Sequence, residues 1–270
     1  MLQAADLVFG YPGRAPVLRG VTMEMPANSF VGILGPNGSG KTTLLRALAG
    51  VVRPSGGRVL LDGRDLASIP RHLIARRMAV VPQETQLAFD YTVLEVVLMG
   101  RYPYLGTFEV EGPADFTVAR ESLSATGTLE FQDRAFDTLS GGEKQRVILA
   151  AALAQIAGAE QDGILLLDEP TVALDLAYQL ELGTLLRDLQ RRRPMAIAVS
   201  THDLNFAASL CRTLVLLKDG EVLAAGPTES VLTSDHIRLL YGVDAEVTRH
   251  AGTGRIIVVP LQRVAPGGEP

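Results

Sequence analysis

Apolar and polar side chains alternate in the first part of this chain, over 2–9 and 17–25, with Tyr11-Pro12-Gly13 between the two runs. This pattern predicts two antiparallel strands joined by a turn. Residues 30–34 are almost all apolar, which is typical of a strand covered on both faces. A glycine-rich turn follows, and leucines at helical spacing then predict a helix over 42–49.

The middle of the chain has a different pattern from its two ends. Between Glu84 and Gly158 apolar residues recur at helical spacing, which predicts helices over 93–101, 119–126 and 143–156. Strand patterns occur on either side of this stretch, at 59–62, 78–81, 164–167, 195–200 and 214–217. An amphipathic helix over 176–193 ends before Pro194, and Asp219-Gly220 predicts a hairpin turn. The alternation predicts an α/β fold with a mostly parallel sheet, antiparallel strands on one side and an inserted helical part.

Composition and charge limit the class of protein. The chain has 270 residues, of which 47% are apolar and 20% are charged, so it can bury a core and is too apolar for a disordered chain. Its net charge of −5 argues against nucleic acid as the main ligand, and its single cysteine excludes a disulfide framework. We find neither an apolar run of about 18 residues that could span a membrane nor an N-terminal signal pattern. We therefore expect a soluble intracellular protein.

Residues 35–42 carry the first chemical motif. Their sequence, Gly-Pro-Asn-Gly-Ser-Gly-Lys-Thr, matches the phosphate-loop pattern GxxxxGK[ST] and lies between a predicted buried strand and a predicted helix. Glycines let backbone N–H groups turn toward a phosphate, and the N-terminus of the following helix attracts its negative charge. Lys41 can reach the β- and γ-phosphate oxygens, and the Thr42 hydroxyl can bind Mg²⁺. The alternative, an ordinary glycine-rich turn, is disfavoured by the strand–loop–helix context.

Two acidic residues follow the buried strand predicted at 164–167. Asp168 and Glu169 stand at the carboxyl edge of the sheet, where ligands bind in open α/β folds. One carboxylate can hold Mg²⁺, and the other can orient and deprotonate an attacking water molecule. An acidic pair after a strand can also be only the start of a helix, but together with the phosphate loop it indicates nucleotide hydrolysis.

A second glycine-rich turn, Leu-Ser-Gly-Gly-Glu at 139–143, precedes a predicted helix. A helix N-terminus at this position can bind an anion. Ser140 and Glu143 also have the spacing of a capping box, so the segment can equally be a capped helix start. Both interpretations can hold at once, because a capped helix end can still bind phosphate.

Together these motifs resemble those of the ATPase subunits of ABC transporters, whose signature is LSGG followed by Gln or Glu. The resemblance covers nearly the whole chain and implies a P-loop NTPase fold, with a RecA-like core, an antiparallel β subdomain and an inserted helical subdomain over about 84–160. It implies a single ATPase domain over 1–264 and a flexible tail over 265–270. Val172 departs from the family, which usually has a small polar residue there, leading into the D-loop.

The resemblance also assigns roles to individual residues. The residues that it implies in catalysis are Glu169, His202, Gln83 and Lys41. The residues that it implies as Mg²⁺ ligands are Thr42, Gln83 and Asp168. Tyr11 would stack on adenine, and Ala173-Leu174-Asp175 would form the D-loop. The residues that it implies in ATP binding are Tyr11, Gly35, Pro36, Asn37, Gly38, Ser39, Gly40, Lys41, Thr42, Thr43, Ser140, Gly141, Gly142, Glu143 and Asp175.

ABC ATPases work as head-to-tail pairs, so the resemblance implies a homodimer. The signature of one copy, Ser140 to Gly142, would close over ATP held by the other copy. Two transmembrane permease subunits would be separate chains, as in bacterial importers, with an extracytoplasmic substrate-binding protein as an indirect partner. The protein would lie peripherally at the cytoplasmic face of the bacterial inner membrane, without inserting into it and without binding nucleic acid.

The segment after Gln83 indicates the class of transported molecule. Residues 89–104 resemble the TV-x-E-x-V-x-x-GRYP pattern of ATPases that serve ferric-siderophore, haem and cobalamin importers. We expect an amphipathic helix there, and the exposed tyrosines expected to contact the permease are Tyr91, Tyr102 and Tyr104. The alternative is that these tyrosines only pack the helical part. An ATPase for another small-molecule importer is one alternative. A soluble ABC ATPase of translation, DNA repair or chromosome organisation is another, although this chain lacks the second ATPase unit, coiled coil or basic surface typical of those proteins.

The remaining candidate residues indicate no further chemistry. His72, His236 and His250 have no partners at the spacing of metal ligands, so we expect surface or capping roles for them. Cys211 is expected in the core.

Overall fold

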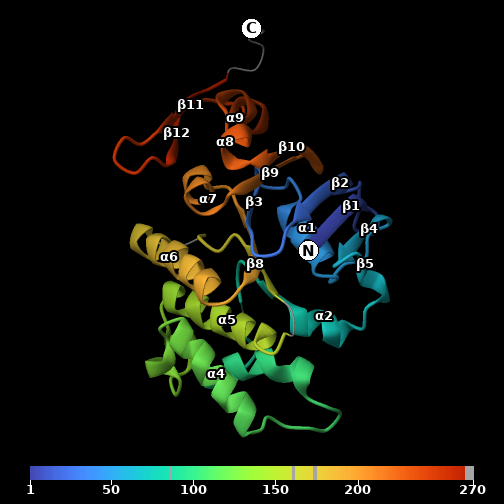
Figure 1. The fold of residues 1–270 in the computed structure, drawn as a ribbon, viewed down its shortest axis with the longest axis vertical. Helices are drawn as coiled ribbons and strands as arrows, with labels where there is room; N and C mark the ends of the chain where they lie inside the picture. Colours follow the sequence, from blue (N-terminus) through green and yellow to red (C-terminus); the bar gives the residue numbers. More distant parts are fainter. Residues whose placement is uncertain (86, 160–161, 173–174, 265–270) are drawn as a thin grey trace. The chain divides into compact units, whose positions relative to one another are not determined.

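The computed structural model describes residues 1–85, 87–159, 162–172 and 175–264. The chain forms two compact units (Figure 1): unit 1 combines Met1–Ala67 with Ala198–Pro270, and unit 2 is Ser68–Ile197. The tail predicted over 265–270 and two of the three D-loop residues, Ala173 and Leu174, lie outside the described residues.

A four-stranded antiparallel sheet forms the N-terminal part of unit 1. Its order is β2-β1-β4-β5, and its strands are β1 (Leu2–Phe9), β2 (Leu18–Met25), β4 (Gly56–Leu61) and β5 (Arg64–Asp65). β1 pairs with β2 from Leu2↔Met25 to Phe9↔Leu18, and β2 buries every second residue along its C-terminal half. The alternating pattern therefore predicted these two strands and their turn correctly.

Unit 1 also holds strands in the order β10-β9-β3-β8. They are β3 (Phe30–Leu34), β8 (Met195–Thr201, which enters from unit 2), β9 (Thr213–Lys218) and β10 (Glu221–Pro227). All of β3 is buried and it runs parallel to β9, as its apolar sequence predicted. The hairpin between β9 and β10 turns at Asp219 (φ 48°) and Gly220 (φ 83°), the two left-handed positions that this turn requires. Helix α1 (Lys41–Leu48) follows β3.

The C-terminal elements of unit 1 were not predicted. They are α7 (Leu204–Leu210), α8 (Thr228–Val231), α9 (Ser234–Tyr241) and the antiparallel pair β11 (Val243–Arg249) and β12 (Ile256–Arg263). Helix α7 holds β12 through Asn205, whose side-chain amide donates to Val258 O at 3.2 Å while its carbonyl accepts from Val258 N at 2.8 Å. These helices are short and β12 is largely exposed, so none has a sustained apolar period.

Unit 2 contains the parallel pair β6 (Met78–Val81) and β7 (Gly163–Asp168) and the helices α2 to α6. The helices are α2 (Arg71–Arg77), α3 (Val93–Leu98), α4 (Pro113–Ala125), α5 (Gly141–Ile156) and α6 (Leu176–Arg192). The 3₁₀ segments are η1 (Leu66–Ser68), which begins in unit 1, η2 (Met99–Tyr104), η3 (Leu129–Phe131) and η4 (Phe136–Thr138). Helices α3, α4 and α5 enclose a buried apolar cluster. None of the helices in the described ranges combines the length and hydropathy that a membrane-spanning helix requires.

The helix predicted over 93–101 is too long at its C-terminus. It ends at Leu98 and continues as η2, where Gly100 packs so closely on α5 that an added Cβ would lie 2.2 Å from Ala151 O. The helix predicted over 119–126 starts earlier, at Pro113, because proline is favoured in a first turn. The antiparallel strand β4 and the buried strands β6 and β7 correspond to predicted strands.

Two of the three tyrosines predicted to be exposed are half-buried in unit 2. Two guanidinium groups lie over the Tyr104 ring, with Arg101 Cζ 3.8 Å and Arg76 Cζ 4.7 Å from the ring centroid. The Tyr104 hydroxyl donates to Gln155 O at 3.0 Å. Tyr91 packs against the apolar cluster of the helices. The expectation was wrong because helical spacing shows which residues share a face, not which neighbours cover it. Tyr102 is 57% exposed, as predicted.

Candidate nucleotide-binding site

The phosphate loop of unit 1 has a backbone that only glycine fits at three positions. A Cβ on Gly35 would lie 2.2 Å from Leu217 O and 2.5 Å from Ser39 Oγ, so the loop passes tightly against the end of β9. Gly38 (φ 82°) and Gly40 (φ 105°) have left-handed backbones. The hairpin turn supports the same loop, since Gly220 N donates to Ser39 O at 3.1 Å.

Donor groups are concentrated in this loop. Lys41 is 5% exposed, and its Nζ donates to Gly35 O at 2.8 Å and to Pro36 O at 3.2 Å. The Ser39 hydroxyl is buried with no hydrogen-bond partner among the described residues. Helix α1 starts at the loop with no acidic residue in its first turn and no side-chain cap. An ammonium, a hydroxyl and a helix N-terminus with no acidic residue in its first turn suit a polyphosphate, so the residues fit the predicted nucleotide.

Two more predicted residues belong to unit 1. The Tyr11 hydroxyl lies 3.5 Å from Thr43 Oγ1 in α1, and this hydrogen bond, with the nearby Arg46 guanidinium, lowers the pKa of the tyrosine below 10.0. The half-buried Tyr11 ring also packs edge-on against Phe9, so its orientation is fixed. His202 is exposed in the bend that follows β8, the strand next to β3.

In unit 2, three predicted residues follow two neighbouring parallel strands. β6 and β7 pair up to Val81↔Leu167, so their carboxyl ends lie at one edge. Asp168 is the last residue of β7, and both it and Glu169 are 6% exposed. Gln83 is exposed two residues beyond β6. Glu169 has a left-handed backbone, φ 47°, which is unusual for a residue with a side chain and is typical of functional turns.

The signature turn forms the capping box that its spacing predicted. Ser140 N and Ser140 Oγ each donate to Glu143 Oε2 at 2.7 Å, and Ser140 Oγ accepts from Glu143 N at 3.4 Å. These bonds from Ser140, the largest influence, lower the pKa of the Glu143 carboxyl below 4.5. Ser140 and Gly141 are exposed, whereas Gly142 is buried. The start of α5 is therefore accessible to a ligand at Ser140 and Gly141, whereas Gly142 is covered by the rest of the protein.

Asp175, the described residue of the D-loop, begins α6. Its carboxylate accepts a hydrogen bond from Tyr178 N at 2.9 Å, which caps the helix. In unit 1, the structure thus brings Tyr11 together with the loop and helix start at 35–43. In unit 2, Gln83 and the Asp168–Glu169 pair follow strand ends at the same edge of the sheet. Tyr178 was not singled out in the sequence, because a tyrosine on an amphipathic helix carries no motif.

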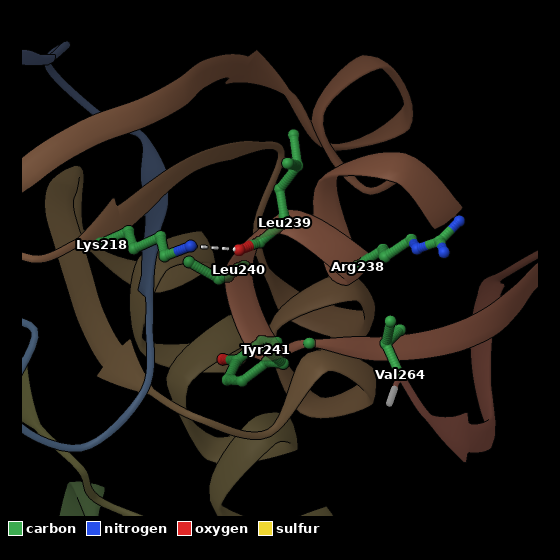
Figure 2. A pocket seen from close by; sticks show the side chains of 7 residues that line it. Lys218, Arg238, Leu239, Leu240, Tyr241 and Val264 are labelled. Carbon is green, nitrogen blue, oxygen red and sulfur yellow. Dashed lines mark hydrogen bonds between the residues drawn. The ribbon is translucent and has the colours of Figure 1, made fainter. Parts of the chain in front are cut away.

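A pocket of about 600 Å³ in unit 1 contains none of the motif residues (Figure 2). It is lined by Lys218, Arg238, Leu239, Leu240, Tyr241, Gly242 and Val264. Its two cations have partners: Lys218 Nζ donates to Leu239 O at 2.7 Å, and Arg238 Nε lies 3.5 Å from Asp244 Oδ1. We assign it no chemistry.

The other side chains considered in the sequence have structural surroundings. His236 Nδ1 lies 2.7 Å from Val231 O, and His250 Nδ1 lies 3.1 Å from Thr253 Oγ1. Within the described ranges, no three His, Cys, Asp or Glu side chains are grouped as metal ligands. Cys211 is buried, as predicted, and burial raises the pKa of its thiol to about 12.

The comparison with protein families matches residues 18–172 to the ABC transporter family. The match covers more than half of the chain, so the chain belongs to this family. Its fold is that of the ABC ATPases, and the predicted class, a nucleotide-binding ATPase of this family, is confirmed.

Individual relatives match the chain along nearly all of its length. It is 42% identical to the hemin import ATP-binding protein HmuV of Bordetella pertussis, over 96% of this chain and 98% of HmuV. It is 37% identical to the ferric enterobactin transport ATP-binding protein FepC of Escherichia coli, over 98% of this chain and 96% of FepC. It is 40% identical to the cobalamin import ATP-binding protein BtuD of Halobacterium salinarum, over 91% of this chain and 60% of BtuD.

Solved structures match the fold as well. A chain of an inward-facing ABC transporter is 30% identical with a TM-score of 0.82, and the match covers 96% of each chain. The dimeric bacterial ABC transporter cassette MJ0796 is 28% identical with a TM-score of 0.71, over 84% of this chain and 99% of that one.

Proposed function

We propose that this chain is the ATP-binding and ATP-hydrolysing subunit of an ABC importer for iron chelates, haem or cobalamin. The observation that carries the proposal is the 42% identity to a hemin import ATP-binding protein over 96% of the chain and 98% of the relative. The similar proteins named for ferric enterobactin and cobalamin support the wider class. The geometry of the phosphate loop supports the binding of ATP.

In this proposal, the residues of unit 1 bind ATP through its phosphates and its base. The buried Lys41 ammonium would exchange the carbonyl oxygens of Gly35 and Pro36 for β- and γ-phosphate oxygens. The first-turn N–H groups of α1 would donate to the same phosphates. The Tyr11 ring, fixed by Phe9 and Thr43, would stack on adenine.

The residues proposed to hold Mg²⁺ are Thr42, Gln83 and Asp168. When bound, Mg²⁺ neutralises phosphate charge and orients the γ-phosphate. Glu169, whose backbone is left-handed, would accept the proton of the attacking water. His202 would contact the γ-phosphate from the end of β8.

A complete site in this proposal needs two copies of the chain. Ser140 to Gly142 of one copy, together with Asp175, would close over the nucleotide of the other, which excludes water from the reacting phosphate. Two separate permease chains would cross the membrane, and an extracytoplasmic substrate-binding protein would deliver the cargo to them. The pair would lie at the cytoplasmic face of the inner membrane. We also propose a single ATPase domain over 1–264, with the helical subdomain at about 84–160.

The test is uptake by the native host after deletion of the chromosomal copy. We expect the deletion to abolish use of one cargo among haem, a ferric siderophore and cobalamin, and a plasmid copy to restore it. A plasmid copy with Lys41→Ala should not restore uptake, because the ammonium is needed at the phosphates. Lys218→Ala is the matched control, since Lys218 binds the end of α9 and lies outside the phosphate loop. Unchanged uptake of all three cargoes in the deletion strain would contradict the proposal.

A further inference from the structure

Two adjacent glycines of the signature turn have different surroundings. A Cβ on Gly142 would lie 2.4 Å from Cδ1 and 2.6 Å from Cε1 of the Tyr178 ring, so the ring packs directly on the glycine backbone. A Cβ on Gly141 would meet nothing within 4 Å among the described residues. Of these two glycines, only Gly142 is therefore restricted to glycine by its contacts with the described residues.

Tyr178 connects this turn to the start of α6. Its backbone N–H donates to Asp175 Oδ1 at 2.9 Å, which fixes the carboxylate of the D-loop residue. Its ring reaches across to α5 and covers Gly142. One residue thus contacts both segments that, in the proposed dimer, face the nucleotide of the second copy.

The Tyr178 ring has little freedom to move. The Arg146 guanidinium lies 5.7 Å from the ring centroid, and Arg146 Nη1 lies 3.6 Å from Glu181 Oε2 on α6. A pocket of only about 10 Å³ lies beside the ring, lined by Gly142, Gln145, Arg146, Tyr178, Glu181 and Leu182. The starts of α5 and α6 are therefore packed as one body, with the ring between them.

We propose that Tyr178 is a positioning residue that holds the signature turn and Asp175 in one fixed arrangement. This inference rests on the proposed function, in which both segments act on ATP held by the second copy. It assigns the two glycines separate roles. Gly142 is glycine because Tyr178 of the same chain occupies the space of a side chain, whereas Gly141 leaves the exposed face open for the partner's nucleotide.

The first test separates nucleotide binding from turnover. Tyr178→Ala should leave the ATP affinity of the isolated subunit unchanged when measured without Mg²⁺, because the phosphate loop lies in unit 1. Its ATP hydrolysis should fall roughly tenfold to a hundredfold, as expected when a reacting group is misplaced by about 1 Å. Tyr178→Phe keeps the ring and should hydrolyse ATP at the wild-type rate. If Tyr178→Ala does not fold, Tyr178→Leu takes its place with the same expectation.

The second test asks why position 142 needs glycine. Gly142→Ala should lose hydrolysis, and the double variant Gly142→Ala/Tyr178→Ala should recover to the level of Tyr178→Ala alone, because the ring no longer meets the methyl group. Gly141→Ala is the matched control. The loss of ATP hydrolysis that it causes should persist when Tyr178→Ala is added.

Two results would overturn the inference. One is wild-type hydrolysis by a folded Tyr178→Ala protein. The other is a double variant in which Gly142→Ala costs as much activity as it does beside the intact tyrosine. A wild-type protein that does not hydrolyse ATP at all would instead contradict the proposed function, so the two failures are distinguishable.

Discussion

Lys41 is one of only three lysines in a chain with 25 basic residues, and it is nearly fully buried in the phosphate loop. Its Nζ fits between two carbonyl groups of the loop as a compact charge. We predict that Lys41→Arg, which keeps the charge but adds a planar group, lowers ATP turnover by about a hundredfold. The measurement is phosphate release by the purified proteins. Turnover within a few-fold of wild type would show that any positive charge suffices at this position.

The capping box at the signature makes a second prediction, which concerns pH. The folded pKa of Glu143 lies below 4.5, so the ionised side chain contributes stability above pH 4.5 and this contribution disappears as the pH falls through the folded pKa. Glu143→Gln removes the charge. The difference in Tm between wild type and variant should therefore be largest near pH 6 and should shrink toward about pH 3. A difference that is constant over this range would contradict a role for the carboxylate charge.

At the scale of elements, the packed Tyr104 ring joins η2 to α2 and α5. The Arg76 and Arg101 guanidinium groups lie over the ring, and the hydroxyl donates to Gln155 O and accepts from Gly158 N at 3.2 Å. Arg101 Nε in turn lies 2.9 Å from Asp115 Oδ1 of α4. We predict that Tyr104→Ala lowers the free energy of unfolding by roughly 2–4 kcal/mol through lost packing. Tyr104→Phe should cost about 1 kcal/mol for the lost hydrogen bonds.

Urea unfolding of the purified proteins checks this prediction. The control is Tyr102→Ala, whose side chain is 57% exposed and should change stability by no more than about 0.5 kcal/mol. If Tyr104→Ala is as stable as Tyr102→Ala, the ring does not join these elements.

Individual elements differ in how well the sequence predicts them, and the same holds for the residues of the candidate site. Fully buried strands such as β3 and β7 were predictable, because nearly every position in them is apolar. The phosphate loop was predictable, because its glycine conformations leave a fixed spacing in the sequence. The β11–β12 pair and α7 were not, since Asn205 and a few long-range contacts hold them without an apolar period. Tyr178 was also missed, because its partner Gly142 lies on another helix and no local pattern links the two.

For the molecule as a whole, the proposed mechanism of hydrolysis requires two copies of the chain. Glu169 would accept a proton from water, and an amide in its place can position water but cannot take its proton. ATP would then remain bound, and the two copies would stay closed around it.

The need for two copies is tested by the mass of Glu169→Gln, measured by light scattering with ATP and Mg²⁺. We expect the mass to rise from the 28.8 kDa of one chain to that of two, and to return to that of one chain when ATP is removed. Adding Lys41→Ala to the same protein should prevent the rise. A mass that stays at one chain while ATP is bound, or ATP hydrolysis by Glu169→Gln at the wild-type rate, would contradict the account.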